Sequence, residues 1–105
     1  MFIKYDEYDL LELFLSEPTS LVDNLETGEL MYLFKGEDSF ELIMTLSVYE
    51  QTCWVSITYK KTVVFRGEFS EVSSLEKRDE KLIINIKGEE KLRLTFKNQI
   101  SAEVL

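Results

Sequence analysis

Apolar residues recur at two spacings along the chain, and the first of these spacings is helical. Near the start of the sequence, apolar neighbours three and four positions apart occur within the set Leu10, Leu11, Leu13, Phe14 and Leu15. Asp6 is a suitable N-cap, and Pro18 disfavours a helical conformation at the residue that precedes it. The pattern therefore predicts one helix, over residues 6–16.

From residue 29 onward, apolar residues alternate with polar ones, and β-branched and aromatic residues become frequent. A period of two places one set of side chains on a single face of a strand. The alternation predicts six to seven strands, over residues 29–35, 40–48, 53–59, 63–69, 82–86, 92–96 and, for a short last strand, 100–104. Gly67 is expected to mark a bulge or a bend that lets the sheet curl. Residues 70–80 are polar and are expected to form a solvated turn or a short helical excursion.

The order of these elements indicates the fold class. Successive strands joined by short polar loops, without helices between them, favour an antiparallel meander over parallel βαβ units. We expect a mainly β protein, of the α+β type with one N-terminal helix, whose curled sheet forms a partial barrel or a sandwich. The helix is expected to cover one opening or face. The length of 105 residues matches a single domain over residues 1–105.

The residue types that most catalytic and metal sites require are rare in this sequence. There is no histidine, which is the commonest general base and zinc ligand. Cys53 is the only cysteine, and its place in the apolar run Cys53-Trp54-Val55 indicates a buried hydrophobe. The four glycines are isolated, so no phosphate-binding loop is formed. We expect no catalytic residue, no cofactor and no metal, and a protein that is not an enzyme.

We also expect no signal peptide and no membrane-spanning segment. The first five residues lead directly into the acids Asp6, Glu7 and Asp9, without the basic and apolar regions of a signal peptide. The longest apolar runs, such as residues 30–34, are far shorter than the roughly 20 residues that cross a bilayer. We therefore expect a cytoplasmic protein that does not bind a membrane.

Charge is distributed unequally between the two halves of the chain. Residues 1–50 contain 12 acidic and 2 basic residues, whereas residues 51–105 contain 8 and 10. The acids near the predicted helix and first hairpin are the candidate partner-binding residues, hereafter the candidate acids: Asp6, Glu7, Asp9, Glu12, Glu37, Asp38 and Glu41. If helix and hairpin lie on one side, these acids create a negative field that steers a basic partner. The alternative is that they only make the surface soluble.

Aromatic residues on the predicted strands, such as Trp54 and Phe65, also occur in oligonucleotide-binding barrels. The net charge of −8 opposes that interpretation, because a polyanionic backbone requires a positive track. We therefore expect no binding to nucleic acid.

Three features of the chain together are similar to a known class of proteins. They are the acids from Asp6 to Glu17, the segment Glu37-Asp38-Ser39-Phe40-Glu41, and the meander through Tyr49 and Trp54. The chain resembles the immunity proteins of bacterial toxin–immunity systems, many of which are single acidic cytoplasmic domains that neutralise a cognate nuclease toxin. The resemblance covers the whole chain in character and rests on no diagnostic motif. It implies that helix and hairpin carboxylates imitate a nucleic-acid backbone and cover the basic active site of a toxin domain.

A second interpretation stays open, namely a small ligand-binding or accessory β-barrel protein with a hydrophobic cavity. A basic toxin-like partner with salt-sensitive association would favour the first interpretation, and a deep pocket with a bound small molecule the second. We expect a monomer or a weak homodimer, in which the last strand, residues 100–104, is the edge available for pairing.

Overall fold

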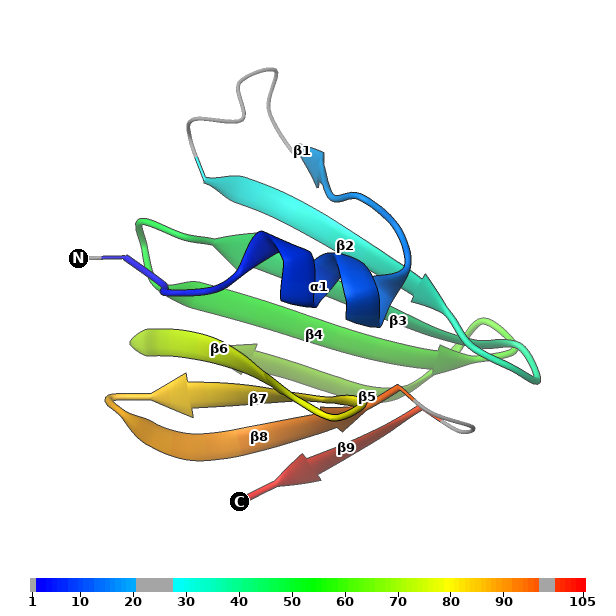
Figure 1. Cartoon of the computed structure of the whole chain (residues 1–105). Coiled ribbons are helices and arrows are strands. Elements are labelled where there is room, and N and C mark those ends of the chain that lie inside the picture. The colour runs from blue at the N-terminus through cyan, green and yellow to red at the C-terminus, as the bar shows by residue number, and fades with distance from the viewer. Residues whose placement is uncertain (1, 21–27, 97–99) are drawn as a thin grey trace.

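The computed structural model describes residues 2–20, 28–96 and 100–105 of the chain. In these residues it contains one helix and nine strands, arranged as two antiparallel sheets (Figure 1). The helix is α1 (Glu7–Phe14), and the five-stranded sheet contains β1 (Thr19–Ser20), β2 (Glu29–Lys35), β3 (Phe40–Ser47), β4 (Thr52–Tyr59) and β5 (Thr62–Phe69), in that order. The four-stranded sheet contains β6 (Val72–Arg78), β7 (Lys81–Ile86), β8 (Glu89–Thr95) and β9 (Ser101–Val104).

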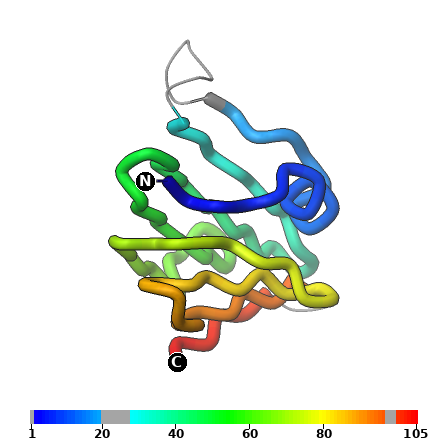
Figure 2. The backbone as a smooth tube through the Cα atoms, turned by 60° about the vertical axis from the view of Figure 1, so that its left-hand side comes forward, coloured from blue at the N-terminus to red at the C-terminus, as the bar shows by residue number. Residues whose placement is uncertain are grey.

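Side chains from both sheets form one hydrophobic core, and Figure 2 traces the backbone of the strands that contribute to it. In the five-stranded sheet the buried positions alternate along β2, β3 and β4, as the period of two predicts. Leu42, Met44 and Leu46 of β3 are fully buried. Leu82 of β7 and Leu92 of β8, in the other sheet, belong to the same core cluster. The mainly β class with one N-terminal helix is thus confirmed, and the sheets do not close into a barrel.

Helix α1 begins and ends at two well-defined caps. The Asp6 carboxylate accepts a hydrogen bond from the backbone N–H of Tyr8 at 2.8 Å, which satisfies a donor of the first turn. At the other end, Leu15 adopts a left-handed conformation with φ of 57° and donates its N–H to the Leu11 carbonyl. The helix therefore ends at Phe14, two residues before the predicted end.

The buried face of α1 closes the opening between the sheets, as was expected of the helix. Leu10, Leu13 and Phe14 are buried. The Phe14 ring lies 5.0 Å from the ring of Tyr32 in β2 and 4.9 Å from that of Phe96, which follows β8. One aromatic side chain of the helix thus contacts both sheets.

The extended segment before the helix also joins the two sheets, through backbone hydrogen bonds. Ile3 donates its N–H to the carbonyl of Val48, at the end of β3. Lys4 donates to the carbonyl of Ser73 in β6, and its own carbonyl accepts from Leu75 at 2.9 Å. Lys4 and Ser74 consequently form a parallel bridge at the free edge of β6.

The prediction for residues 70–80 was wrong, since most of this segment is strand β6. Val72 and Leu75 are its buried residues, and they are three positions apart because the register against β7 shifts between Val72 and Ser74. This irregularity breaks the alternation that would have marked a strand. The predicted number of strands was too low because neither β6 nor β1 was predicted.

Of the bulge or bend expected at Gly67, the bulge was wrong, because Gly67 pairs in register with Val55. The register between β4 and β5 shifts at Ile57 and Thr58, which pair with Phe65 and Val63, so the additional residue is Val64. A Cβ atom at Gly67 would lie 2.8 Å from the ring of Phe69. Glycine at this position therefore makes room for a neighbouring aromatic ring.

Candidate functional site

The candidate acids of the helix differ in how far other residues already use them. The Asp6 carboxylate caps α1, and Glu12 forms an ion pair with Lys77 of β6 at 2.8 Å. That hydrogen bond and the charge of Glu12 raise the pKa of Lys77. Glu7 and Asp9 are exposed or partly exposed and have no ion pair with the described part of the chain. The helix thus presents two carboxylates that are free to contact a partner.

The remaining candidate acids lie at the turn between β2 and β3. Glu37 and Asp38 are exposed in this turn, and Glu41 is partly exposed in β3, where it stands opposite Lys35 in the register. Figure 1 shows the turn at the right-hand end of the strands, beyond the C-terminal end of α1. The candidate acids therefore form a helix group and a turn group. That they act as one surface stays a prediction.

Four of the nine described basic residues in the second half of the chain are paired with acids of the same half. Six of the seven ion pairs found among the described residues lie within residues 71–103: Arg78 with Glu76 and with Glu90, Lys87 with Glu71, Lys91 with Glu89, and Arg93 with Glu90 and with Glu103. The hydrogen bond from Arg93 lowers the pKa of Glu90 and raises that of Arg93. Much of the charge on the four-stranded sheet is thus balanced by residues of the same half of the chain.

The acids of residues 1–50 lack such compensation. Of the described acids in this half, Glu12 alone has an ion pair within the described residues; the others are Asp6, Glu7, Asp9, Glu17, Glu29, Glu37, Asp38, Glu41 and Glu50. Charges that are not balanced internally project a field into the solvent, where a partner of opposite charge experiences it. The excess negative charge of the sequence therefore lies on the helix and the five-stranded sheet, where it can act on a partner in solution.

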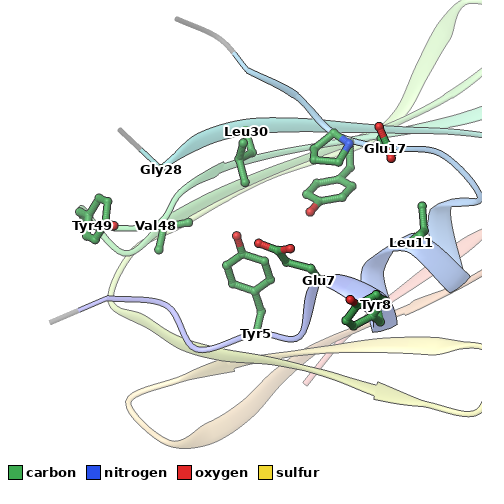
Figure 3. Close-up of a pocket in the computed structure, with 11 residues that line it drawn as sticks. Tyr5, Glu7, Tyr8, Leu11, Glu17, Gly28, Leu30, Val48 and Tyr49 are labelled. Atoms are coloured by element: carbon green, nitrogen blue, oxygen red, sulfur yellow. The ribbon is translucent and has the colours of Figure 1, made fainter. Parts of the chain in front are cut away.

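A pocket of about 500 Å³ opens between α1 and the adjacent ends of β2 and β3 (Figure 3). Its lining residues come from four stretches of the chain: Tyr5, Glu7, Tyr8, Leu11, Glu17, Pro18, Gly28, Leu30, Tyr32, Val48 and Tyr49. Figure 3 shows the Tyr5 hydroxyl and the Glu7 carboxylate pointing toward each other inside it. One predicted site residue, Glu7, thus lies in a pocket that the sequence did not reveal.

The pocket is aromatic and negative. Four tyrosines and two carboxylates line it, and its lining includes no lysine or arginine from the described residues. Burial raises the pKa of Tyr5, and the nearby Glu7 and Tyr49 raise it further. Burial also raises the pKa of Tyr32, with smaller contributions from Tyr5 and Glu7. Ionised groups at the pocket therefore disfavour further negative charge and favour a cation.

The other candidate chemistry has a simpler structural explanation. Cys53 is fully buried, and burial raises the pKa of its thiol to about 12, so the thiolate that would react is scarce. Within residues 2–20, 28–96 and 100–105, no three Cys, His, Asp or Glu side chains are grouped to hold a metal ion. None of the helices in this part of the chain is long and apolar enough to span a membrane.

No protein-family model matches the sequence, and no curated protein matches it. A solved structure of a contact-dependent growth inhibition toxin–immunity protein complex from Klebsiella pneumoniae 342 does contain a similar chain. The TM-score is 0.80, and the similarity covers 100% of this chain and 98% of that chain at 18% sequence identity. The two-sheet fold with its N-terminal helix is therefore shared, over its full length, with a component of a toxin–immunity complex.

Proposed function

We propose that this protein is an immunity protein, which binds a toxin and blocks it without catalysing a reaction. The observation that carries the proposal is the full-length structural similarity to a chain from a toxin–immunity complex. The uncompensated acids of residues 1–50 support it, because an inhibitor that acts by binding needs a surface that selects its partner. The protein acts as a monomer in the cytoplasm, where its toxin would otherwise act.

The toxin that fits this surface is a nuclease type with a basic active site. A nuclease must hold a polyanionic backbone, so cationic side chains line its site. The candidate acids occupy those cations in place of the substrate, and the bulk of the domain excludes the nucleic acid. Long-range attraction accelerates the association of such a pair and is weakened by salt.

The test is capture of the partner with the purified protein, followed by assay of the captured protein for nuclease activity with and without the bait. The triple variant Glu37→Gln, Asp38→Asn, Glu41→Gln removes the turn group and is expected to slow association about tenfold at low ionic strength. Glu68→Gln is the control, since Glu68 is exposed on β5 and is not a candidate acid. Capture of no toxin, or association independent of salt, contradicts the proposal.

The pocket between α1 and β2 favours a second candidate function, the binding of a small ligand. Its volume of about 500 Å³ lies within the roughly 300–1,000 Å³ of small-molecule sites. Native mass spectrometry of the freshly purified protein distinguishes the two functions. A stoichiometric small molecule that dissociates on unfolding supports ligand binding, and a mass equal to that of the polypeptide supports the toxin-binding role.

A further inference from the structure

The pocket between α1 and the five-stranded sheet is more than a group of surface acids. Tyr32 lines it from β2, and this residue is only 1% exposed. Its hydroxyl has no hydrogen bond with any described residue. No fully buried polar side-chain atom among the described residues lacks a partner, so this hydroxyl is open to the pocket. A hydroxyl on a buried side chain is thus left free for a hydrogen bond with a ligand.

Two carboxylates and three further phenols line the same pocket. Glu7 projects from the first turn of α1, and Figure 3 shows its carboxylate in the middle of the pocket beside the Tyr5 hydroxyl. Glu17 lies at the upper rim in the same view, and Tyr49 lies at the end opposite Leu11. The described residues contribute no positive charge to the lining. The charge that complements the two carboxylates is therefore expected on the ligand.

The residue types select among cations. A metal ion would need several oxygen ligands close together, and no such group is found among the described residues. A guanidinium group is planar and weakly hydrated, pairs with a carboxylate through two hydrogen bonds, and stacks on aromatic rings. Tyrosine faces attract it further through the charge distribution of the ring. The pocket offers carboxylates, phenol oxygens and aromatic faces together.

We propose that this pocket binds an arginine side chain of the protein partner, held by the Glu7 carboxylate, the hydroxyl of Tyr32 and the tyrosine rings. This inference rests on the proposed function, because an immunity protein has a protein partner and the excess acid selects a basic one. It assigns Glu7 a specific contact, whereas the turn group acts at longer range. It also provides a partner for the Tyr32 hydroxyl, which has no hydrogen bond with any described residue.

The first experiment needs no toxin. The full chain, labelled with ¹⁵N, is titrated with Nα-acetyl-arginine methylamide, and Nα-acetyl-citrulline methylamide serves as the uncharged probe of the same shape. Arginine is expected to shift the amide signals of Gly28, Tyr32 and Val48 in a saturable manner, and citrulline is not. Equal shifts with both probes, or arginine shifts confined to other residues, overturn the assignment.

Variants then locate the contact. Glu7→Gln removes the charge and Tyr32→Phe removes the hydroxyl, and each is expected to weaken arginine binding at least fivefold. Glu68→Gln changes the net charge as much as Glu7→Gln does and is expected to change binding less than twofold. Circular dichroism spectra must match those of the parent protein. Unchanged arginine affinity in a folded Glu7→Gln variant overturns the assignment.

The second experiment uses the captured toxin and separates this inference from the proposed function. Glu7→Gln is expected to bind the toxin roughly tenfold more weakly, mainly through faster dissociation. If Glu7→Gln neutralises the toxin with unchanged affinity, the pocket assignment is overturned and the immunity role stands. If the pocket binds arginine and no toxin is neutralised, the immunity role is overturned and the cation site stands.

Discussion

Replacing Phe14 by alanine tests whether helix α1 is an integral part of the core. Phe14 is 2% exposed, and its ring packs against rings from both sheets, Tyr32 at 5.0 Å and Phe96 at 4.9 Å. The Phe14–Phe96 pair has an interplanar angle of 78°, the edge-to-face arrangement that aromatic pairs favour. Removing the ring therefore leaves a cavity where the helix and the two sheets meet.

The expected loss follows from these contacts. Phenylalanine-to-alanine changes in a core cost about 3–5 kcal/mol in the free energy of unfolding. Each aromatic pair accounts for about 0.5–1.5 kcal/mol of such a cost, and Phe14 has two pairs, so we expect a total of about 4 kcal/mol. A chain of this length has a free energy of unfolding of about 5–15 kcal/mol. The variant should thus remain folded in water with much of its stability lost.

Urea denaturation followed by far-ultraviolet circular dichroism measures this loss. With a slope of about 2 kcal/mol per molar urea, the midpoint should fall by about 2 M. Leu15→Ala is the control, because Leu15 is 77% exposed at the end of the same helix, and it should change stability by less than about 0.5 kcal/mol. A loss below about 1 kcal/mol for Phe14→Ala would show that α1 is peripheral and would refute this account of the core.

Four further predictions concern single residues. Leu15→Gly should raise the free energy of unfolding by about 0.5–1 kcal/mol in urea denaturation, because glycine adopts the left-handed conformation at φ of 57° without strain. Asp6→Ala should lower the free energy of unfolding by about 1 kcal/mol, and Asp6→Asn should lower it by much less, since an asparagine side chain can still cap the helix. Equal losses in the two variants would show that the charge of Asp6 matters more than its hydrogen bond. Asn85→Ala should cost about 1–3 kcal/mol in the same assay, because this buried amide donates to Ser74 and to the Glu76 carboxylate at 2.7 Å. Native Cys53 should react with a thiol reagent at pH 8 at least about a hundredfold more slowly than Cys53 in the unfolded chain, because burial raises the pKa of its thiol to about 12. The pKa of the unfolded thiol is about 8.5, so the stability that this thiol contributes should be lost as the pH rises above about 8.5.

The elements that the sequence predicts well are those whose pattern reflects burial on one face only. Strand β3 alternates Leu42, Met44 and Leu46 in the core with more exposed residues between them, and its limits were predicted within one residue. Helix α1 was predicted for the same reason, together with its Asp6 cap. Where one face of a helix or strand is buried and the other is exposed to solvent, the hydrophobic pattern specifies the structure directly.

Strands β6 and β7 show where that reasoning fails. In β7 the four residues from Leu82 to Asn85 are all buried, because charged side chains of β6 and β8 cover the outer face at Ile83 and Asn85. In β6 a register shift interrupts the alternation, and the edge that the strand presents is occupied by Lys4. Both features depend on residues distant in the sequence, so a local pattern cannot reveal them.

The candidate site was predictable in its charge and not in its shape. Composition alone identified the acidic first half, and the structure explains why that charge is uncompensated. The pocket was missed because its lining unites residues 5–18 with residues 28–32 and 48–49. Tyr32 and Tyr49 have no sequence feature that separates them from ordinary core and surface tyrosines. A sequence can display a charge imbalance, whereas a concave site exists only once distant strands are paired.

The hydrogen bonds of Ile3 and Lys4 have a consequence for how the protein is made. During synthesis Lys4 leaves the ribosome before its partners Ser73 and Leu75, which are translated some seventy residues later. The first sheet can pair its own strands before then, but its link to the second must wait. Ribosome-bound chains that stop before β6 should therefore leave Lys4 open to proteolysis, and chains in which β6 and β7 have folded should protect it.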